Sequence, residues 1–236
     1  MANPSLVLPE IEKPGRMTIQ EYAYVRLRHA LMVGSIAPGV PVTIRGLAEA
    51  MAVSPTPVRE ALRRLSSQNA LSVLKNRRIV VPPMTAKRFN ELISLRCAIE
   101  IHAAERALPH ISEAIIDRLV AIDAVMDEAV EAQDRITLII QNQQFHGHIY
   151  RSNRDQLSMP MIESIWLQLG PFMRIALRHV GTFYGIDRHK EIISALRNRN
   201  LDDLLRAIHA DIHDGVGWFD ESALEKILGP EQTKSL

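Results

Sequence analysis

The stretch VSPTPVREAL, residues 53–62, constrains the fold more than any other, because two prolines stand at the head of a helical pattern. Proline disrupts a helix interior, but the first turn tolerates it, since the amides there have no intrahelical acceptor. Pro55 and Pro57 therefore predict the start of a helix. Ser54 takes the N-cap position, where its hydroxyl can accept a hydrogen bond from a first-turn amide.

The predicted helix has an apolar side, which faces inward, and a side that projects arginines. These are Arg59, Arg63 and Arg64. One interpretation is a basic, solvated helix. A DNA-recognition helix is favoured, because Arg59 lies near the N-terminal end, which points at base edges when a helix-turn-helix docks in the major groove.

The residues before this helix complete a helix-turn-helix pattern. Thr18 and Glu21 form a capping box for a helix that runs to about Val33 and ends at Gly34. After a turn at residues 37–39, Thr43 can cap a second helix over residues 44–51.

The residues after the recognition helix predict a wing. Residues 72–75 and 79–81 favour two short strands, joined by a basic tip of Asn76, Arg77 and Arg78. These residues form a plain basic hairpin or a wing that reaches a minor groove or phosphates. Pro82 and Pro83 then end the strand and mark the domain boundary.

The charge distribution also separates this segment from the rest of the chain. Residues 18–84 hold nine Lys or Arg against three acids, whereas residues 85–236 carry a net charge of −5. A basic segment joined to an acidic remainder indicates a nucleic-acid module attached to a second function. The single cysteine, Cys97, favours a reducing cytoplasm, and we expect neither a membrane span nor a secretory signal.

The remainder of the chain predicts an all-helical bundle, so the fold class is mainly α, with an N-terminal winged helix-turn-helix. We expect a flexible arm over 1–17, the DNA-binding domain over 18–84, a helical domain over 85–222 and a tail over 223–236. Gly170 and Pro171 should interrupt the helices there.

Several predicted helices of the second domain place polar side chains on apolar stripes. Asn142 and His146 are four residues apart, as are His209 and His213, and His189 lies on another stripe. A buried polar group needs a partner, and imidazole is the commonest metal ligand. These residues predict a site for a divalent ion, Zn²⁺ or Ni²⁺, held by Asn142, His146, His189 and His213.

Three further residues are candidates for binding an effector on the same interior. Arg96 would receive an anion, because guanidinium matches a carboxylate in a fork. His209 could replace a metal ligand or lie beside the site, and Arg174 could point inward from a short helix.

Taken together, the two halves resemble the GntR family of bacterial transcription regulators, in the FadR-like branch with an FCD ligand-binding domain. The resemblance is carried by LMVGSIAPGVPVTIRGLAEAMAVSPTPVREALRRL in the first half, and by LRCAIEIHAAERAL, QNQQFHGHIY, DRHKEII and AIHADIHDG in the second.

The resemblance implies operator DNA binding, a homodimer and control by a small organic acid. It assigns DNA contacts to Arg45, Ser54, Thr56 and Arg59 and to the wing tip, to which we add Arg63. The family's metal ligands match Asn142, His146, His189 and His213, and Arg96 matches an arginine that meets the effector carboxylate.

Three positions depart from the family pattern. Pro55 stands where an arginine reads guanine, and Arg78 stands where the wing has glycine. Asn142 stands where the first metal ligand is aspartate. A site of three histidines and an amide should hold its ion less tightly and depend on the effector carboxylate.

The favoured function is a metal-assisted, metabolite-responsive transcription regulator, a repressor, and not an enzyme. One alternative is a metal-dependent hydrolase fused to a DNA anchor, since three histidines with an open position are typical of catalytic zinc. No HExxH motif or obvious general base supports that reading, and Glu100 is the nearest candidate. Another alternative is a sensor whose effector is the metal ion itself.

Overall fold

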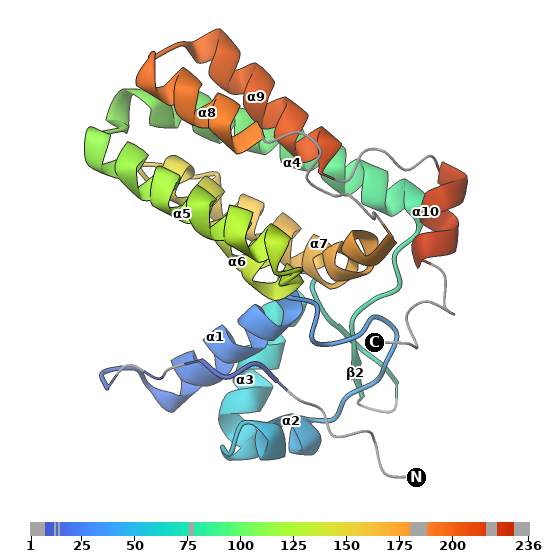
Figure 1. Cartoon of the computed structure of the whole chain (residues 1–236). Coiled ribbons are helices and arrows are strands. Elements are labelled where there is room, and N and C mark those ends of the chain that lie inside the picture. The colour runs from blue at the N-terminus through green and yellow to red at the C-terminus, as the bar shows by residue number, and fades with distance from the viewer. Residues whose placement is uncertain are drawn as a thin grey trace. The chain divides into compact units, whose positions relative to one another are not determined.

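The computed structural model describes residues 8–11, 13, 15–75, 78–179, 188–215 and 221–228 (Figure 1). It divides into two compact units. The first contains Met1–Thr85, Trp166–Ile175 and Glu225–Leu236, and the second contains Ala86–Ile165 and Ala176–Leu224. The first unit carries a winged helix-turn-helix and the second a helical bundle, so the predicted fold class is confirmed.

The helix-turn-helix consists of α1 (Ile19–Met32), α2 (Ile44–Ala50) and α3 (Pro55–Ser67). The capping box of Thr18 and Glu21 is present in full at the start of α1. Gly34 follows the end of α1 with φ of 66°, in the left-handed region that favours glycine. Thr43 caps α2 by accepting a hydrogen bond from the Gly46 amide. The local signals therefore set these boundaries as expected.

The start of α3 differs from expectation in one respect. Ser54 occupies the N-cap position and Pro55 the first helical position, but the Ser54 hydroxyl makes no capping hydrogen bond. Pro55 and Pro57 have no backbone N–H group. The first turn therefore offers fewer donors to the Ser54 hydroxyl. Ser54 is exposed at the head of the helix.

The predicted wing is present as an antiparallel hairpin. Strand β1 (Ser72–Val73) pairs with β2 (Ile79–Val80), with Ser72 opposite Val80. The Leu74 amide donates to the Arg78 carbonyl over 2.8 Å, which holds the base of the tip. Asn76 and Arg77, at the tip, lie outside the described residues.

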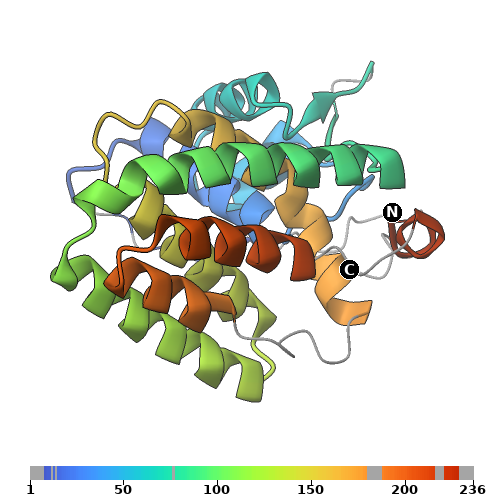
Figure 2. The ribbon, with the colours of Figure 1, turned by 90° about the horizontal axis from the view of Figure 1, so that it is seen from above.

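The second unit is built from helices that pack against one another in a ring. They are α4 (Ala86–Ala107), α5 (Glu113–Glu131), α6 (Arg135–Tyr150), α8 (Arg188–Arg197) and α9 (Leu201–Asp214), with a 3-10 turn at Leu108–His110. In the order α4, α9, α8, α5, α6 each helix contacts the next, and α6 contacts α4 (Figure 2). Ser112, Asp134 and Asn200 cap α5, α6 and α9. This ring encloses the interior in which the polar stripes meet.

One prediction about the later helices is wrong, because helix α7 (Met159–His179) continues through Gly170 and Pro171. A further helix, α10 (Glu221–Leu228), covers the position at which we placed the start of the tail. Burial outweighs the cost of the proline, since Leu169, Phe172 and Ile175 on either side of it are buried. Within the described ranges, no helix combines the length and apolarity that crossing a bilayer requires.

Gly170 is required for close approach and not for breaking a helix. A Cβ atom there would lie 2.7 Å from Met32 Cα and 2.8 Å from the Leu31 carbonyl oxygen, which belong to the same unit. Those are backbone atoms at the end of α1, which cannot swing aside.

Gly170→Ala should therefore lower the free energy of unfolding by about 1–3 kcal/mol, through overpacking. Gly147→Ala is the matched control, because its Cβ would meet only the flexible end of Arg151 while the helix gains propensity. Urea unfolding followed by circular dichroism compares them. Equal stability of the two variants would show that α1 and α7 are not held this closely.

Candidate functional site

The residues predicted to contact DNA lie on the exposed side of the helix-turn-helix. Arg45 on α2 and Ser54, Thr56 and Arg59 on the first turns of α3 are all exposed. The inward side of α3 is buried, including Val58. Helix α3 thus presents its N-terminal end as a polar, basic surface.

The arginines further along α3 are engaged within the protein. Arg63 pairs with Glu60 through Nη2 and Oε2 at 3.0 Å, on the exposed surface. Arg64 lies over the Tyr24 ring, 3.6 Å from its centroid. Arg63 must exchange an ion pair before it can meet a phosphate. Arg78 is exposed beside β2.

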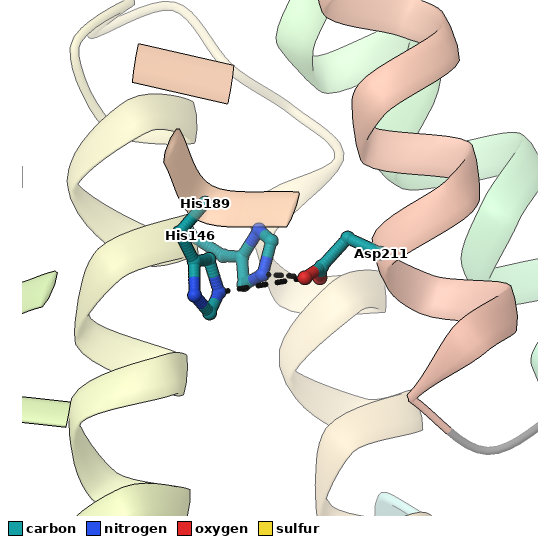
Figure 3. Close-up of side chains that lie close together, drawn as sticks. All are labelled: His146, His189 and Asp211. Atoms are coloured by element: carbon teal, nitrogen blue, oxygen red, sulfur yellow. Dashed lines mark ion pairs between the residues drawn. The ribbon is translucent and has the colours of Figure 1, made fainter. Parts of the chain in front are cut away.

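A second set of functional side chains lies inside the helical unit. His146 on α6, His189 on α8 and Asp211 on α9 bring one potential ligand atom each to within 4.8 Å of one another (Figure 3). His146 Nε2 lies 2.9 Å from Asp211 Oδ2, and His189 Nε2 lies 3.5 Å from Asp211 Oδ1. Both histidines are almost completely buried, and Asp211, which keeps 12% of its side chain exposed, faces them from α9.

His213 does not take part in this cluster, which corrects the predicted ligand set. His213 and His209 are both exposed on α9, with ring centroids 5.8 Å apart. Asp211 is two residues from each of them, which places it on the opposite side of a helix with 3.6 residues per turn. The buried stripe of α9 consists of Leu204, Ala207, Ile208 and Ile212, and Asp211 belongs to that side. This apolar stripe is the signal in the sequence that could have pointed to Asp211.

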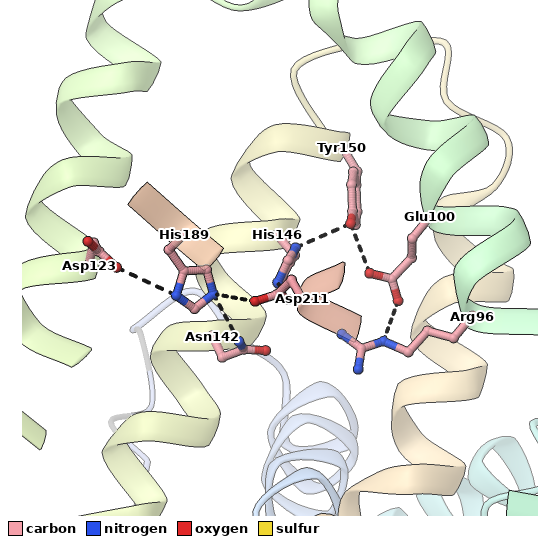
Figure 4. Close-up of polar contacts among 8 residues, drawn as sticks. All are labelled: Arg96, Glu100, Asp123, Asn142, His146, Tyr150, His189 and Asp211. Atoms are coloured by element: carbon pink, nitrogen blue, oxygen red, sulfur yellow. Dashed lines mark hydrogen bonds and ion pairs between the residues drawn. The ribbon is translucent and has the colours of Figure 1, made fainter. Parts of the chain in front are cut away.

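The outer nitrogens of both imidazoles contact oxygen atoms of other side chains (Figure 4). His146 Nδ1 lies 3.2 Å from the hydroxyl of Tyr150, and His189 Nδ1 lies 3.5 Å from Asp123 Oδ1. Such partners fix the ring orientation and direct Nε2 toward a shared centre. Asn142 joins from α6, with its Nδ2 3.2 Å from His189 Nε2.

The cluster has the properties of a metal site. His146 Nε2 is buried and, within the described part of the chain, has no hydrogen-bond partner, because its short approach to Asp211 lacks hydrogen-bond geometry. Two imidazole nitrogens and a carboxylate are a common donor set for divalent transition metals. Asp211 brings into the cluster the carboxylate that Asn142 lacks, so the residues that converge here differ from the predicted set of three histidines and an amide.

Electrostatics favours the charged form of the carboxylate. Burial by itself would raise the pKa of Asp211, but the imidazoles of His189 and His146 outweigh it and lower that pKa well below its ordinary value. Burial and the Glu100 carboxylate raise the pKa of Tyr150 well above its ordinary value. At neutral pH the cluster therefore contains an ionised Asp211 and a protonated phenol.

Arg96, the residue predicted to receive an anion, is buried in the same helical unit. Its Nε donates to Glu100 Oε1 over 2.7 Å, and both side chains are buried on α4. Among the described residues this is the hydrogen bond that Arg96 makes, so Nη1 and Nη2 keep their donors for another group. His209 is exposed outside this interior, and the side chain of Arg174 lies outside what the structure describes.

Comparison with known proteins places these features in one family. The FCD domain profile matches residues 91–214, and the profile of the bacterial regulatory proteins of the gntR family matches residues 19–81. The chain belongs to the GntR family, with an FCD domain.

Relatives of this GntR-family chain are named as regulators. The HTH-type transcriptional regulator McbR of Escherichia coli (strain K12) is 32% identical over 145 residues, which span 61% of this chain and 66% of McbR. The gluconate operon transcriptional repressor of Bacillus licheniformis is 27% identical over 225 residues, covering 87% of this chain and 88% of the repressor.

Solved structures share the fold of this GntR-family chain. Escherichia coli McbR/YncC matches with a TM-score of 0.80 at 24% identity, covering 85% of this chain and 96% of that chain. A GntR transcriptional regulator from Rhodococcus sp. RHA1 matches with a TM-score of 0.67 at 21% identity, covering 89% and 98%. These likenesses support the architecture of both parts of the chain.

The buried Arg96–Glu100 pair should matter for stability in this GntR-family protein, whereas the exposed Arg63–Glu60 pair should not. Glu100→Gln leaves a buried guanidinium without its counter-charge and should cost about 3–5 kcal/mol. Glu60→Gln is the matched control and should cost about 0–1 kcal/mol, because solvent screens that pair. Urea unfolding measures both, and similar losses would mean that Arg96 is solvated.

Proposed function

We propose that this protein is a homodimeric, cytoplasmic transcription regulator that binds operator DNA through α3 and the wing. Its FCD domain would bind a divalent metal ion and a small carboxylate effector, and effector binding would change the affinity for DNA. The single observation that carries this proposal is the joining of an exposed basic helix-turn-helix to a buried cluster of His146, His189 and Asp211. A regulator is favoured over a hydrolase, because the relatives are named as regulators.

Operator binding is supported by the exposed head of α3. Ser54, Thr56 and Arg59 lie where a recognition helix meets base edges, and Arg59 can donate two hydrogen bonds to a guanine. Pro55 cannot donate, so the bases next to Arg59 would be read by hydroxyls and by contact. Repression is supported by the names of relatives such as the gluconate operon repressor.

The metal would be held by His146, His189 and Asp211, and Asn142, whose amide lies beside His189, could add its Oδ1 as a fourth ligand. Zn²⁺ and Ni²⁺ both suit imidazole and carboxylate donors. When bound, the ion would supply a Lewis acid that anchors an oxygen of the effector. The protein side chains keep the ligand atoms converged and exclude water from them.

The effector is proposed to be a small organic acid because of Arg96. The guanidinium offers Nη1 and Nη2 as a fork for a carboxylate, next to a cluster that would hold a cation. An effector that prefers one conformation of the FCD domain would shift the population of dimers able to bind DNA.

Arg59→Ala should weaken binding to an operator duplex, selected from random DNA by the wild-type chain, by about 1–3 kcal/mol if Arg59 reads a base. Arg206→Ala removes the same charge from the exposed surface of α9 and should leave the affinity unchanged. Fluorescence anisotropy titration at one fixed salt concentration compares them. Unchanged affinity of Arg59→Ala would refute the recognition-helix assignment.

Zn²⁺ retained after dialysis should fall strongly in His146→Ala and in Asp211→Asn, because the first change removes an imidazole ligand and the second removes the negative charge of the carboxylate. His213→Ala is the matched control on α9 and should retain the wild-type amount, since its side chain is exposed. Elemental analysis measures the bound ion. Loss of the ion in His213→Ala with retention in Asp211→Asn would reinstate the ligand set expected from sequence.

A further inference from the structure

A continuous chain of buried polar contacts joins Arg96 to the His146 imidazole (Figure 4). Arg96 Nε donates to Glu100 Oε1 over 2.7 Å. The Tyr150 hydroxyl donates to the other carboxylate oxygen, Oε2, over 2.9 Å and lies 3.2 Å from His146 Nδ1. Tyr150 and Glu100 lie 50 positions apart in the chain, so α4 and α6 must pack in one register to form this connection.

The donors and acceptors along this chain allow one arrangement of protons. A carboxylate only accepts hydrogen bonds, and a phenol has a single proton to donate. Because Tyr150 donates that proton to Glu100, the proton between Tyr150 and the imidazole must belong to His146 Nδ1. A proton on Nδ1 leaves Nε2, which faces Asp211, as the ring nitrogen that can give up its proton to a metal ion. The contact with Tyr150 therefore holds the ring with its ligand nitrogen toward the cluster.

We infer that Tyr150 is a positioning residue that couples the effector arginine Arg96 to the metal ligand His146, so that effector and metal each strengthen the binding of the other. This inference rests on the proposed function, since it needs a metal ion at His146 and an anion at Arg96. The chain of hydrogen bonds through Glu100 and Tyr150 would couple the two sites in addition to any direct contact between the effector and the ion.

The sign of the coupling follows from the shared guanidinium. An anion on Nη1 and Nη2 competes with Glu100, the direct ion-pair partner of Arg96, for the positive charge of the guanidinium. Glu100 then accepts more strongly from Tyr150, whose oxygen accepts more strongly from His146 Nδ1–H. A stronger hydrogen bond at Nδ1 makes Nε2 a better metal ligand. Linkage requires that the metal strengthen effector binding by the same factor.

The test removes the hydroxyl of Tyr150 in the full chain and uses Zn²⁺ alone as the probe. Tyr150→Phe should lower the Zn²⁺ affinity by about 10–100-fold, the usual effect of losing such a partner. Competition with a chromophoric chelator measures this affinity. Tyr24→Phe is the matched control, because its hydroxyl bonds to Gln68 in the other unit, and it should bind Zn²⁺ like wild type.

A second readout distinguishes positioning from simple packing. In the metal-free protein, the ¹⁵N chemical shift of His146 Nδ1 should report a protonated, hydrogen-bonded nitrogen in wild type and should change in Tyr150→Phe. The Arg96 end of the polar chain is tested with Arg96→Lys, which keeps the positive charge but loses the Nε donor that is aligned with Glu100. It should weaken Zn²⁺ binding less than Tyr150→Phe does, and should add nothing in the double variant.

The outcomes separate this inference from the proposed metal site. If His146→Ala loses Zn²⁺ while Tyr150→Phe keeps the wild-type affinity or the wild-type ¹⁵N shifts, the metal site stands and the coupling is overturned. An additive effect of Arg96→Lys in the double variant also overturns it. If His146→Ala binds Zn²⁺ as tightly as wild type, the metal site itself fails, and the coupling with it.

Discussion

A carboxylate facing two buried imidazoles is the interaction on which the helical unit depends. Asp211, His146 and His189 come from α9, α6 and α8, and none of them could be placed in an apolar interior alone without a large cost in free energy. Each is tolerated because the other two are near. The three helices must therefore pack with one rotation about their axes and one register along them. A shift of any of them would leave a buried polar group without its neighbours.

The side chains outside this centre follow the same rule. Tyr150 and Asp123 approach the outer nitrogens of the histidines, and Glu100 connects Tyr150 to Arg96. Phe145 packs its ring 4.4 Å from that of His189, centroid to centroid, which limits the rotation of the imidazole. The apolar and polar contacts thus restrain the same imidazole rings.

The helix-turn-helix uses its charges differently, because its arginines are at the surface. Arg63 and Arg64 have partners within the protein, Glu60 and the Tyr24 ring, whereas Arg59 projects from the second turn of α3. A surface pair costs little to exchange for a phosphate, so these contacts are compatible with binding DNA. Pairing in the free protein also reduces repulsion along a helix that carries several positive charges.

The sequence by itself determined the local features: the capping box of α1, the two prolines that begin α3, the hairpin of the wing and the caps of α5 and α6. Each depends on residues within a few positions of one another. It also identified His146, His189 and Arg96 as buried polar residues. Only the tertiary structure decided that Asp211 and not His213 faces the histidines, and that α7 continues through Pro171. Both outcomes depend on which helix face is buried, and that is set by contacts between helices far apart in the chain.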